Sequence, residues 1–119
     1  MKKVYLSWEE FDNMTGKLAK KIIETERQFD GIYGIPRGGL PIAVYLSHKL
    51  DLPLLLYPSK RSLVVDDISD DGKTLNSFRD KFIATLYTTD WTITQPNCWI
   101  DKKKSKDDWI VFPWEGEDE

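Results

Sequence analysis

Residues 62–75 read Ser-Leu-Val-Val-Asp-Asp-Ile-Ser-Asp-Asp-Gly-Lys-Thr-Leu, and they indicate the fold more clearly than any other stretch of the chain. The apolar, β-branched run at 63–65 predicts a buried strand. Two acids, Asp66 and Asp67, follow where that strand would emerge from a sheet. The turn at 70–74 leads into a helix start, where backbone N–H groups can converge on an anion. Adjacent acids suit a ribose diol and a nest of amides suits a phosphate, so the stretch predicts a site for a sugar phosphate.

Helices and strands are expected to alternate along the rest of the chain. Ser7 and Glu10 form a capping box, and apolar residues then recur at helical spacing as far as Ile22. Further apolar patterns predict strands at 31–35, 54–57, 63–68 and 82–87, and helices at 40–50 and 75–79. The alternation predicts an α/β fold in which helices cover a parallel sheet. Such sheets bind ligands beyond the carboxyl ends of their strands.

A second glycine-containing turn, Pro36-Arg37-Gly38-Gly39, follows the strand expected at 31–35. Two glycines let the backbone approach a ligand closely. Arg37 offers a planar fork for phosphate oxygens. Alone, this turn would be interpreted as an ordinary strand-to-helix connection with an exposed arginine. Because both turns follow parallel strands, they should lie at the same end of the sheet, which favours the phosphate-binding interpretation.

Composition restricts the class of protein. The chain has 119 residues, 40% of them hydrophobic, which indicates one folded domain. A net charge of −3 argues against nucleic-acid binding. The single cysteine, Cys98, excludes an internal disulfide and a cysteine metal cluster. No leader-like or membrane-spanning apolar segment is visible, so a cytoplasmic location is expected. We interpret the basic run 102–106 and the acidic tail 115–119 as solvated.

Tryptophans are concentrated near the end of the chain: Trp91, Trp99, Trp109 and Trp114 lie within the last 30 residues. An exposed indole can stack on a flat heterocycle, which is worth roughly 1–3 kcal/mol per base. Packing within a small aromatic lid or a subunit interface is the other interpretation. We favour packing for Trp91, Trp99 and Trp114.

The stretch 62–75 resembles the phosphoribosyl-pyrophosphate (PRPP) motif of type I phosphoribosyltransferases. In that motif an apolar strand precedes two acids, about three variable residues, Thr or Ser, Gly, any residue, and Thr or Ser. Asp66, Asp67, Gly72 and Thr74 match, whereas Asp71 stands where the family has Thr or Ser. A Walker A loop is the rival interpretation of the Gly-Lys-Thr at 72–74. That loop needs a glycine five positions before Gly72, where Asp67 stands.

The resemblance extends from Ser7 to Glu115. The Arg37 turn is similar to the pyrophosphate loop of xanthine–guanine enzymes. The segment 107–115 resembles the purine-binding hood of xanthine–guanine and archaeal hypoxanthine phosphoribosyltransferases. The resemblance implies a three-layer parallel sheet of Rossmann-like type with a small C-terminal hood. It also implies a single domain with a core at about 1–90, hood elements at 91–115 and a tail at 116–119.

The implied reaction transfers a 5-phosphoribosyl group from PRPP to a 6-oxopurine and releases pyrophosphate, as in purine salvage. Magnesium is implied as a cofactor, held mainly by PRPP and indirectly by the two adjacent acids. Relatives usually self-associate, so a dimer or tetramer is expected. The residue roles that the resemblance implies are ribose binding by Asp66 and Asp67, proton acceptance by Asp70, 5′-phosphate binding by Asp71, Gly72, Lys73 and Thr74, pyrophosphate binding by Arg37, Gly38 and Gly39, and purine binding by Trp109, Ile110 and Thr89.

Three departures from the family pattern leave alternatives open. Asp71 places a carboxylate beside the expected phosphate. Only 58–62 joins the second and third expected strands, where the family has a flexible catalytic loop. Thr89 stands where relatives have a lysine that contacts the purine 6-oxo group. A non-catalytic PRPP- or nucleotide-binding module is therefore the alternative. Transfer to another base, such as a pyrimidine, is a third, against which the Trp109 segment argues.

Overall fold

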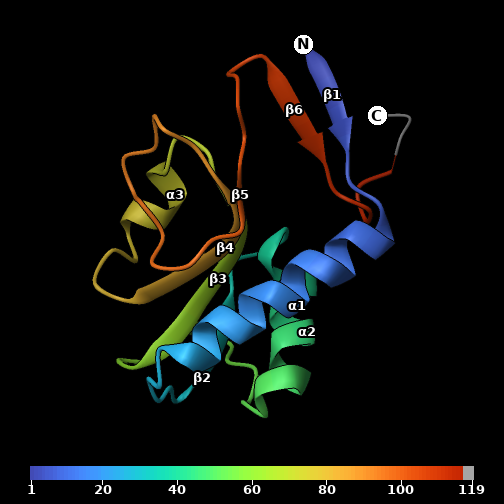
Figure 1. Ribbon diagram of the computed structural model, residues 1–119. Coiled ribbons are helices and arrows are strands. Elements are labelled where there is room, and N and C mark those ends of the chain that lie inside the picture. The colour runs from blue at the N-terminus through green and yellow to red at the C-terminus, as the bar shows by residue number, and fades with distance from the viewer. Residues whose placement is uncertain (117–119) are drawn as a thin grey trace.

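The computed structural model describes residues 1–116, and in that range helices and strands alternate (Figure 1). The acidic tail predicted at 116–119 lies, apart from Gly116, outside the described residues. Among those residues, no helix is both long and apolar enough to cross a bilayer. The elements are β1 (Lys2–Tyr5), α1 (Trp8–Glu24), β2 (Gly31–Gly34), α2 (Gly39–Leu50), β3 (Ser62–Ser69), α3 (Lys73–Asn76), β4 (Phe82–Thr88), β5 (Asp101–Lys102) and β6 (Asp108–Val111).

The main sheet has four parallel strands in the order β2-β3-β4-β5. Helices α1 and α2 cover one face, and α3 lies on the other (Figure 1). This arrangement confirms the predicted three-layer α/β fold. Because the strands are parallel, their carboxyl ends lie at one edge of the sheet, where ligands of such folds bind.

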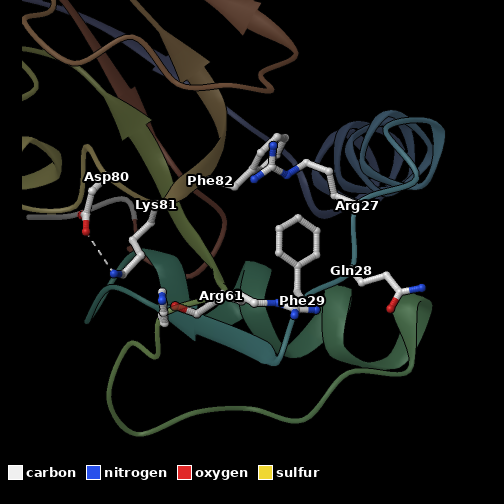
Figure 2. A pocket seen from close by; sticks show the side chains of 9 residues that line it. Arg27, Gln28, Phe29, Arg61, Asp80, Lys81 and Phe82 are labelled. Carbon is white, nitrogen blue, oxygen red and sulfur yellow. Dashed lines mark hydrogen bonds and ion pairs between the residues drawn. The ribbon is translucent and has the colours of Figure 1, made fainter.

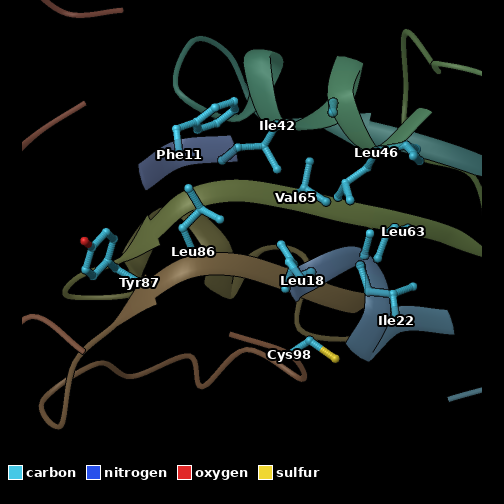
Figure 3. Close-up of a cluster of buried hydrophobic side chains, with 14 of the residues drawn as sticks. Phe11, Leu18, Ile22, Ile42, Leu46, Leu63, Val65, Leu86, Tyr87 and Cys98 are labelled. Atoms are coloured by element: carbon cyan, nitrogen blue, oxygen red, sulfur yellow. The ribbon is translucent and has the colours of Figure 1, made fainter. Parts of the chain in front are cut away.

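Side chains that alternate in direction along β3 pack against helices on both faces of the sheet. Leu63 and Val65 pack beneath α1 and α2 with Leu18, Ile42 and Leu46 (Figure 3). Val64 points to the opposite face, where it packs with Leu75 of α3. Successive side chains of a strand face opposite ways, so an uninterrupted apolar run is what a strand covered on both faces needs.

Helix α1 begins at the predicted capping box. The Glu10 backbone N–H donates to Ser7 Oγ (3.0 Å), and the Ser7 backbone N–H donates to Glu10 Oε1 (2.8 Å). These bonds satisfy amides that the first turn of a helix leaves without partners.

A second, two-stranded parallel sheet joins the two ends of the chain. In it β1 pairs with β6, with Lys2 opposite Asp108 and Tyr5 opposite Val111. The predictions did not include β1, β6 or the short β5, which extends the main sheet beyond residue 90. The division between core and hood near residue 90 stays a prediction.

The strand predicted at 54–57 is absent. Leu54 makes one isolated bridge to Ile32, and the following segment leaves the sheet with Leu56 and Tyr57 strongly exposed. Prolines at 53 and 58 flank this run and cannot donate to a ladder, so it forms no more than a contact with the edge of β2. The helix predicted at 75–79 is also shifted and shorter, at Lys73–Asn76.

Candidate functional site

The paired acids lie where β3 extends past its neighbour. Pairing with β2 ends at Val65, opposite Gly34, whereas pairing with β4 continues to Ser69. Asp66 and Asp67 therefore lie beside the β2–α2 turn. Asp66 is 9% exposed, and its Oδ1 accepts the Asp67 backbone N–H at 2.8 Å. Burial, with the adjacent Asp67 carboxyl as a second cause, raises the pKa of Asp66 to about 8. Burial also raises the pKa of Asp67.

The Arg37 turn packs directly against these acids. A Cβ on Gly38 would overlap the Asp67 carboxylate, and one on Gly39 would overlap the Val65 carbonyl oxygen. The Pro36–Arg37 peptide bond is cis, and the Arg37 side chain is exposed. Only glycine fits so close to β3, so the sequence Arg-Gly-Gly is what allows the turn and the acids to share one site.

A groove of about 820 Å³ connects this corner to the second sheet. Cationic, acidic and indole side chains all lie on its walls. Trp109 and Val111 line it from β6, whereas the Ile110 side chain packs against the hydrophobic core. Trp109 is 54% exposed, which leaves its ring open to a ligand. The residues that line the groove include Lys3, Arg37, Gly38, Asp67, Trp109 and Glu115.

The predicted phosphate loop has the expected turn. Gly72 adopts φ = 81°, a left-handed conformation that favours glycine, and α3 follows it. Asp71 is exposed and its Oδ1 accepts the Lys73 backbone N–H at 2.9 Å. The Asp71 carboxylate therefore accepts the hydrogen bond of one of the amides that a bound phosphate would need. Thr74 and the Lys73 side chain are exposed at the same turn.

The segment 89–94 holds the loop in place. Thr89 Oγ1 donates to the Asp70 carbonyl oxygen (2.6 Å), the Ile93 N–H to that of Asp71 (2.9 Å), and Thr94 Oγ1 to that of Gly72 (2.7 Å). Thr89 is buried and its one donor is already used. The structure therefore does not favour the expected contact between Thr89 and the base.

Lys103 differs most from its prediction. We expected the run 102–106 to be solvated, yet the Lys103 side chain is 6% exposed and its Nζ lies 2.6 Å from Asp70 Oδ2. Trp91 Nε1 donates to the other carboxylate oxygen at 3.1 Å. A local run of lysines carries no sign of a contact that spans 33 residues of sequence. Sequence reasoning therefore missed this group.

A separate basic hollow of about 310 Å³ lies at the opposite, amino end of the strands. It is formed by the connections that precede β2, β3 and β4. Figure 2 shows Arg27 next to the Phe82 ring, at 5.0 Å from its centroid, and Lys81 paired with Asp80 at 3.1 Å. The hollow includes none of the predicted site residues, so the groove beside Asp67 is the candidate site.

No family model matches the chain. The structure is similar to that of a purine phosphoribosyltransferase from Pyrococcus horikoshii. The TM-score is 0.83, and the sequences are 35% identical over 98% of this chain and 97% of that one. The chain belongs to the purine phosphoribosyltransferase family.

Two further similarities agree with membership of this phosphoribosyltransferase family. A xanthine-guanine phosphoribosyltransferase from Idiomarina loihiensis is 26% identical, with 93% of this chain and 86% of that protein covered. The fold of the Helicobacter pylori xanthine-guanine-hypoxanthine phosphoribosyltransferase matches with a TM-score of 0.81, at 20% identity and with 95% and 94% of the two chains covered. The resemblance inferred from the three motifs is therefore confirmed.

Proposed function

We propose that this protein transfers the 5-phosphoribosyl group of PRPP to a 6-oxopurine (xanthine, guanine or hypoxanthine), with release of pyrophosphate, in purine salvage. The observation that carries the proposal is the groove. It brings Arg37, Asp67 and Trp109 together in a chain related over nearly its whole length to a purine phosphoribosyltransferase.

The proposed roles follow the chemistry of the residues in the groove and in the neighbouring turns. Arg37 and the Gly38 amide bind the pyrophosphate of PRPP, since a guanidinium matches phosphate oxygens. Gly39 allows the close approach of this turn, while its own N–H donates to the Ile35 carbonyl oxygen at 2.8 Å. Asp67, with Asp66 behind it, binds the ribose hydroxyls. Gly72, Lys73 and Thr74 bind the 5′-phosphate after Asp71 releases the Lys73 amide. Trp109 stacks on the purine, and the backbone at Ile110 meets its edge. Holding both reactants in one groove lowers the entropic part of the barrier.

The site offers Mg²⁺ a carboxylate ligand but no complete set of protein ligands within residues 1–116. Carboxylate oxygens are the ligands that Mg²⁺ prefers, and Asp67 presents one at the groove. Within residues 1–116, no group of three or more His, Cys, Asp or Glu side chains could hold an ion. We therefore propose that PRPP supplies most ligands and that Asp67, with Asp66, contributes indirectly. When bound, Mg²⁺ neutralises charge on the pyrophosphate.

A non-catalytic PRPP- or nucleotide-binding module is the second candidate. The observation that favours it is the short connection between the Leu54 bridge and β3, which cannot form a long lid. However, the Pyrococcus phosphoribosyltransferase is matched over 97% of its length by 98% of this chain. Because the two chains match over nearly their full lengths and the other is called a phosphoribosyltransferase, the comparison favours the enzyme over the binding module.

Self-association and a cytoplasmic location are parts of the same proposal. Leu56 and Tyr57 are large apolar side chains left exposed after the Leu54 bridge, and they offer a surface for a second copy of the chain. A dimer or tetramer would cover them.

A chromatographic assay tests the proposal. Purified protein is mixed with PRPP, Mg²⁺ and, separately, xanthine, guanine, hypoxanthine and adenine. We expect one or more 6-oxopurines to yield a nucleoside monophosphate and pyrophosphate. Asp67→Asn should weaken PRPP binding, whereas Asp80→Asn, at the amino end of the sheet, should not. PRPP binding by the folded protein without turnover of any base would instead favour the binding module.

A further inference from the structure

We infer that Lys103 and Trp91 are positioning residues that fix the orientation of the Asp70 carboxylate for proton transfer from the purine. The inference rests on the proposed function and adds two residues to its site. Asp70 is the proton acceptor that the family resemblance implies, and these two side chains make the polar contacts of its carboxylate within residues 1–116.

Three hydrogen bonds hold Asp70 on one side. Lys103 Nζ donates to Oδ2 (2.6 Å), Trp91 Nε1 donates to Oδ1 (3.1 Å), and Thr89 Oγ1 donates to the backbone carbonyl oxygen (2.6 Å). An ionised carboxylate has about four lone-pair positions, so each oxygen can accept a further hydrogen bond. The contacts thus restrict rotation of Asp70 without exhausting its capacity to accept a proton.

The ion pair is asymmetric in its exposure to solvent. The Lys103 side chain is 6% exposed, whereas the Asp70 side chain is 39% exposed. Burying an ammonium is costly, and a buried ion pair is weak evidence for a gain in stability. The burial of Lys103 therefore calls for another reason. A cation placed behind a carboxylate whose other side remains open fits a role in orienting that carboxylate.

The backbone and the neighbouring indole hold Lys103 in place. Its N–H donates to the Thr88 carbonyl oxygen at 2.9 Å, at the carboxyl end of β4. Its Nζ lies 5.8 Å from the Trp91 ring centroid, and Lys106 Nζ lies 5.6 Å from the same ring. Lys103 and Trp91 therefore support each other as well as Asp70.

The reaction needs a proton acceptor at a fixed place. A purine nitrogen forms a bond to C1 of the ribose, while the bond from C1 to the pyrophosphate oxygen breaks and its electron pair leaves with pyrophosphate. The purine N–H proton then passes to a carboxylate oxygen of Asp70. General base catalysis of this kind is typically worth about 10²–10⁴-fold and depends on the position of the base. Loss of either donor would let Asp70 rotate, and the rate would fall without weaker binding of PRPP.

The experiment is a double-mutant cycle on the active protein with its best base. We expect Lys103→Met to lower kcat about tenfold or more while the KM for PRPP stays within about threefold, because orientation of the base contributes to the chemical step. Lys103→Arg should restore most of the rate. Trp91→Phe, which keeps an aromatic ring but removes the N–H, should lower kcat by a smaller factor. Lys104→Met, at the adjacent exposed lysine, is the matched control.

The cycle separates an effect through Asp70 from a general structural role. In an Asp70→Asn background, Lys103→Met should cause little further loss of kcat. An equal loss in both backgrounds, or a wild-type kcat for Lys103→Met, would overturn the inference while leaving the proposed function intact. If Lys103→Met does not fold, a normal kcat for Trp91→Phe would overturn it instead. No turnover by the parent protein would overturn the proposed function and this inference together.

Discussion

At the scale of single residues, burial beside a second carboxyl group sets the ionisation of Asp66. Its pKa is raised to about 8, far above the 3.8 of an unperturbed aspartate. Between these two pH values the folded chain keeps a proton that the unfolded chain has released. The contribution of Asp66 to the free energy of unfolding is therefore largest below about pH 4, and it is lost as the pH rises through about 8.

We predict that Asp66→Asn removes this pH dependence. An amide is neutral at every pH, so the variant should be more stable than the parent at pH 8, by on the order of 1–3 kcal/mol, and similar to it near pH 4. Urea unfolding without PRPP or Mg²⁺ at a series of pH values measures the difference. Asp80→Asn, which changes an exposed acid, should keep the parent's dependence between pH 5 and 8. A difference between variant and parent that does not change between pH 4 and pH 8 would contradict the raised pKa of Asp66.

At the scale of elements, hydrogen bonds from 89–94 tie down the predicted phosphate loop at 70–74. Thr94 is buried, and its Oγ1 donates to the Gly72 carbonyl oxygen at 2.7 Å. A Cβ on Gly72 would lie 2.6 Å from the Thr94 backbone nitrogen, so the two segments are in close contact. The loop therefore takes its conformation from this segment as well as from its own glycine.

We predict that Thr94→Val destabilises the protein and weakens PRPP binding. Valine has nearly the same shape but removes one of the two hydrogen bonds to the Gly72 carbonyl oxygen, which keeps the bond from the Asn76 N–H at 2.9 Å. The loss should cost about 0.5–1.5 kcal/mol. Denaturant unfolding gives the first effect, and the KM values for PRPP and for the base give the second. The KM for PRPP should rise more than that for the base. Thr25→Val, at the exposed end of α1, is the control and should leave both KM values unchanged. If Thr94→Val changes the two KM values equally, the segment 89–94 does not support the predicted phosphate loop in particular.

Patterns of neighbouring residues in the sequence predicted the helices and strands that such patterns determine. The capping box at Ser7 and the doubly covered β3 are examples, because neighbouring residues determine both. The pairing of β1 with β6 depends on residues more than 100 positions apart, and the burial of Lys103 depends on Asp70. Those features come from the assembled fold. For the same reason the sequence located the motifs at the carboxyl edge but not Lys103 beside Asp70.

At the scale of the whole molecule, pairing of the two chain ends builds the wall of the groove that faces Asp67. β1 supplies Lys3 to the groove, and β6 supplies Trp109 opposite it in the register. Trp114 fixes this sheet to the core, because its ring stacks on Phe112 at 5.1 Å and contacts Phe11 at 5.4 Å. The second sheet thus presents Trp109 on a supported surface, while the proposed PRPP contacts lie on the main sheet.

This separation predicts a selective effect of Trp109→Ala. Loss of the ring should raise the KM for the base by about tenfold, since stacking is worth roughly 1–3 kcal/mol, and should leave the KM for PRPP nearly unchanged. Steady-state kinetics with each substrate varied in turn measures both values. Trp99→Ala is the matched control, because Trp99 packs with Lys21 and Lys102 and does not line the groove. It should change neither KM. Equal losses for both substrates in Trp109→Ala would mean that the indole maintains the shape of the hood and does not bind the purine.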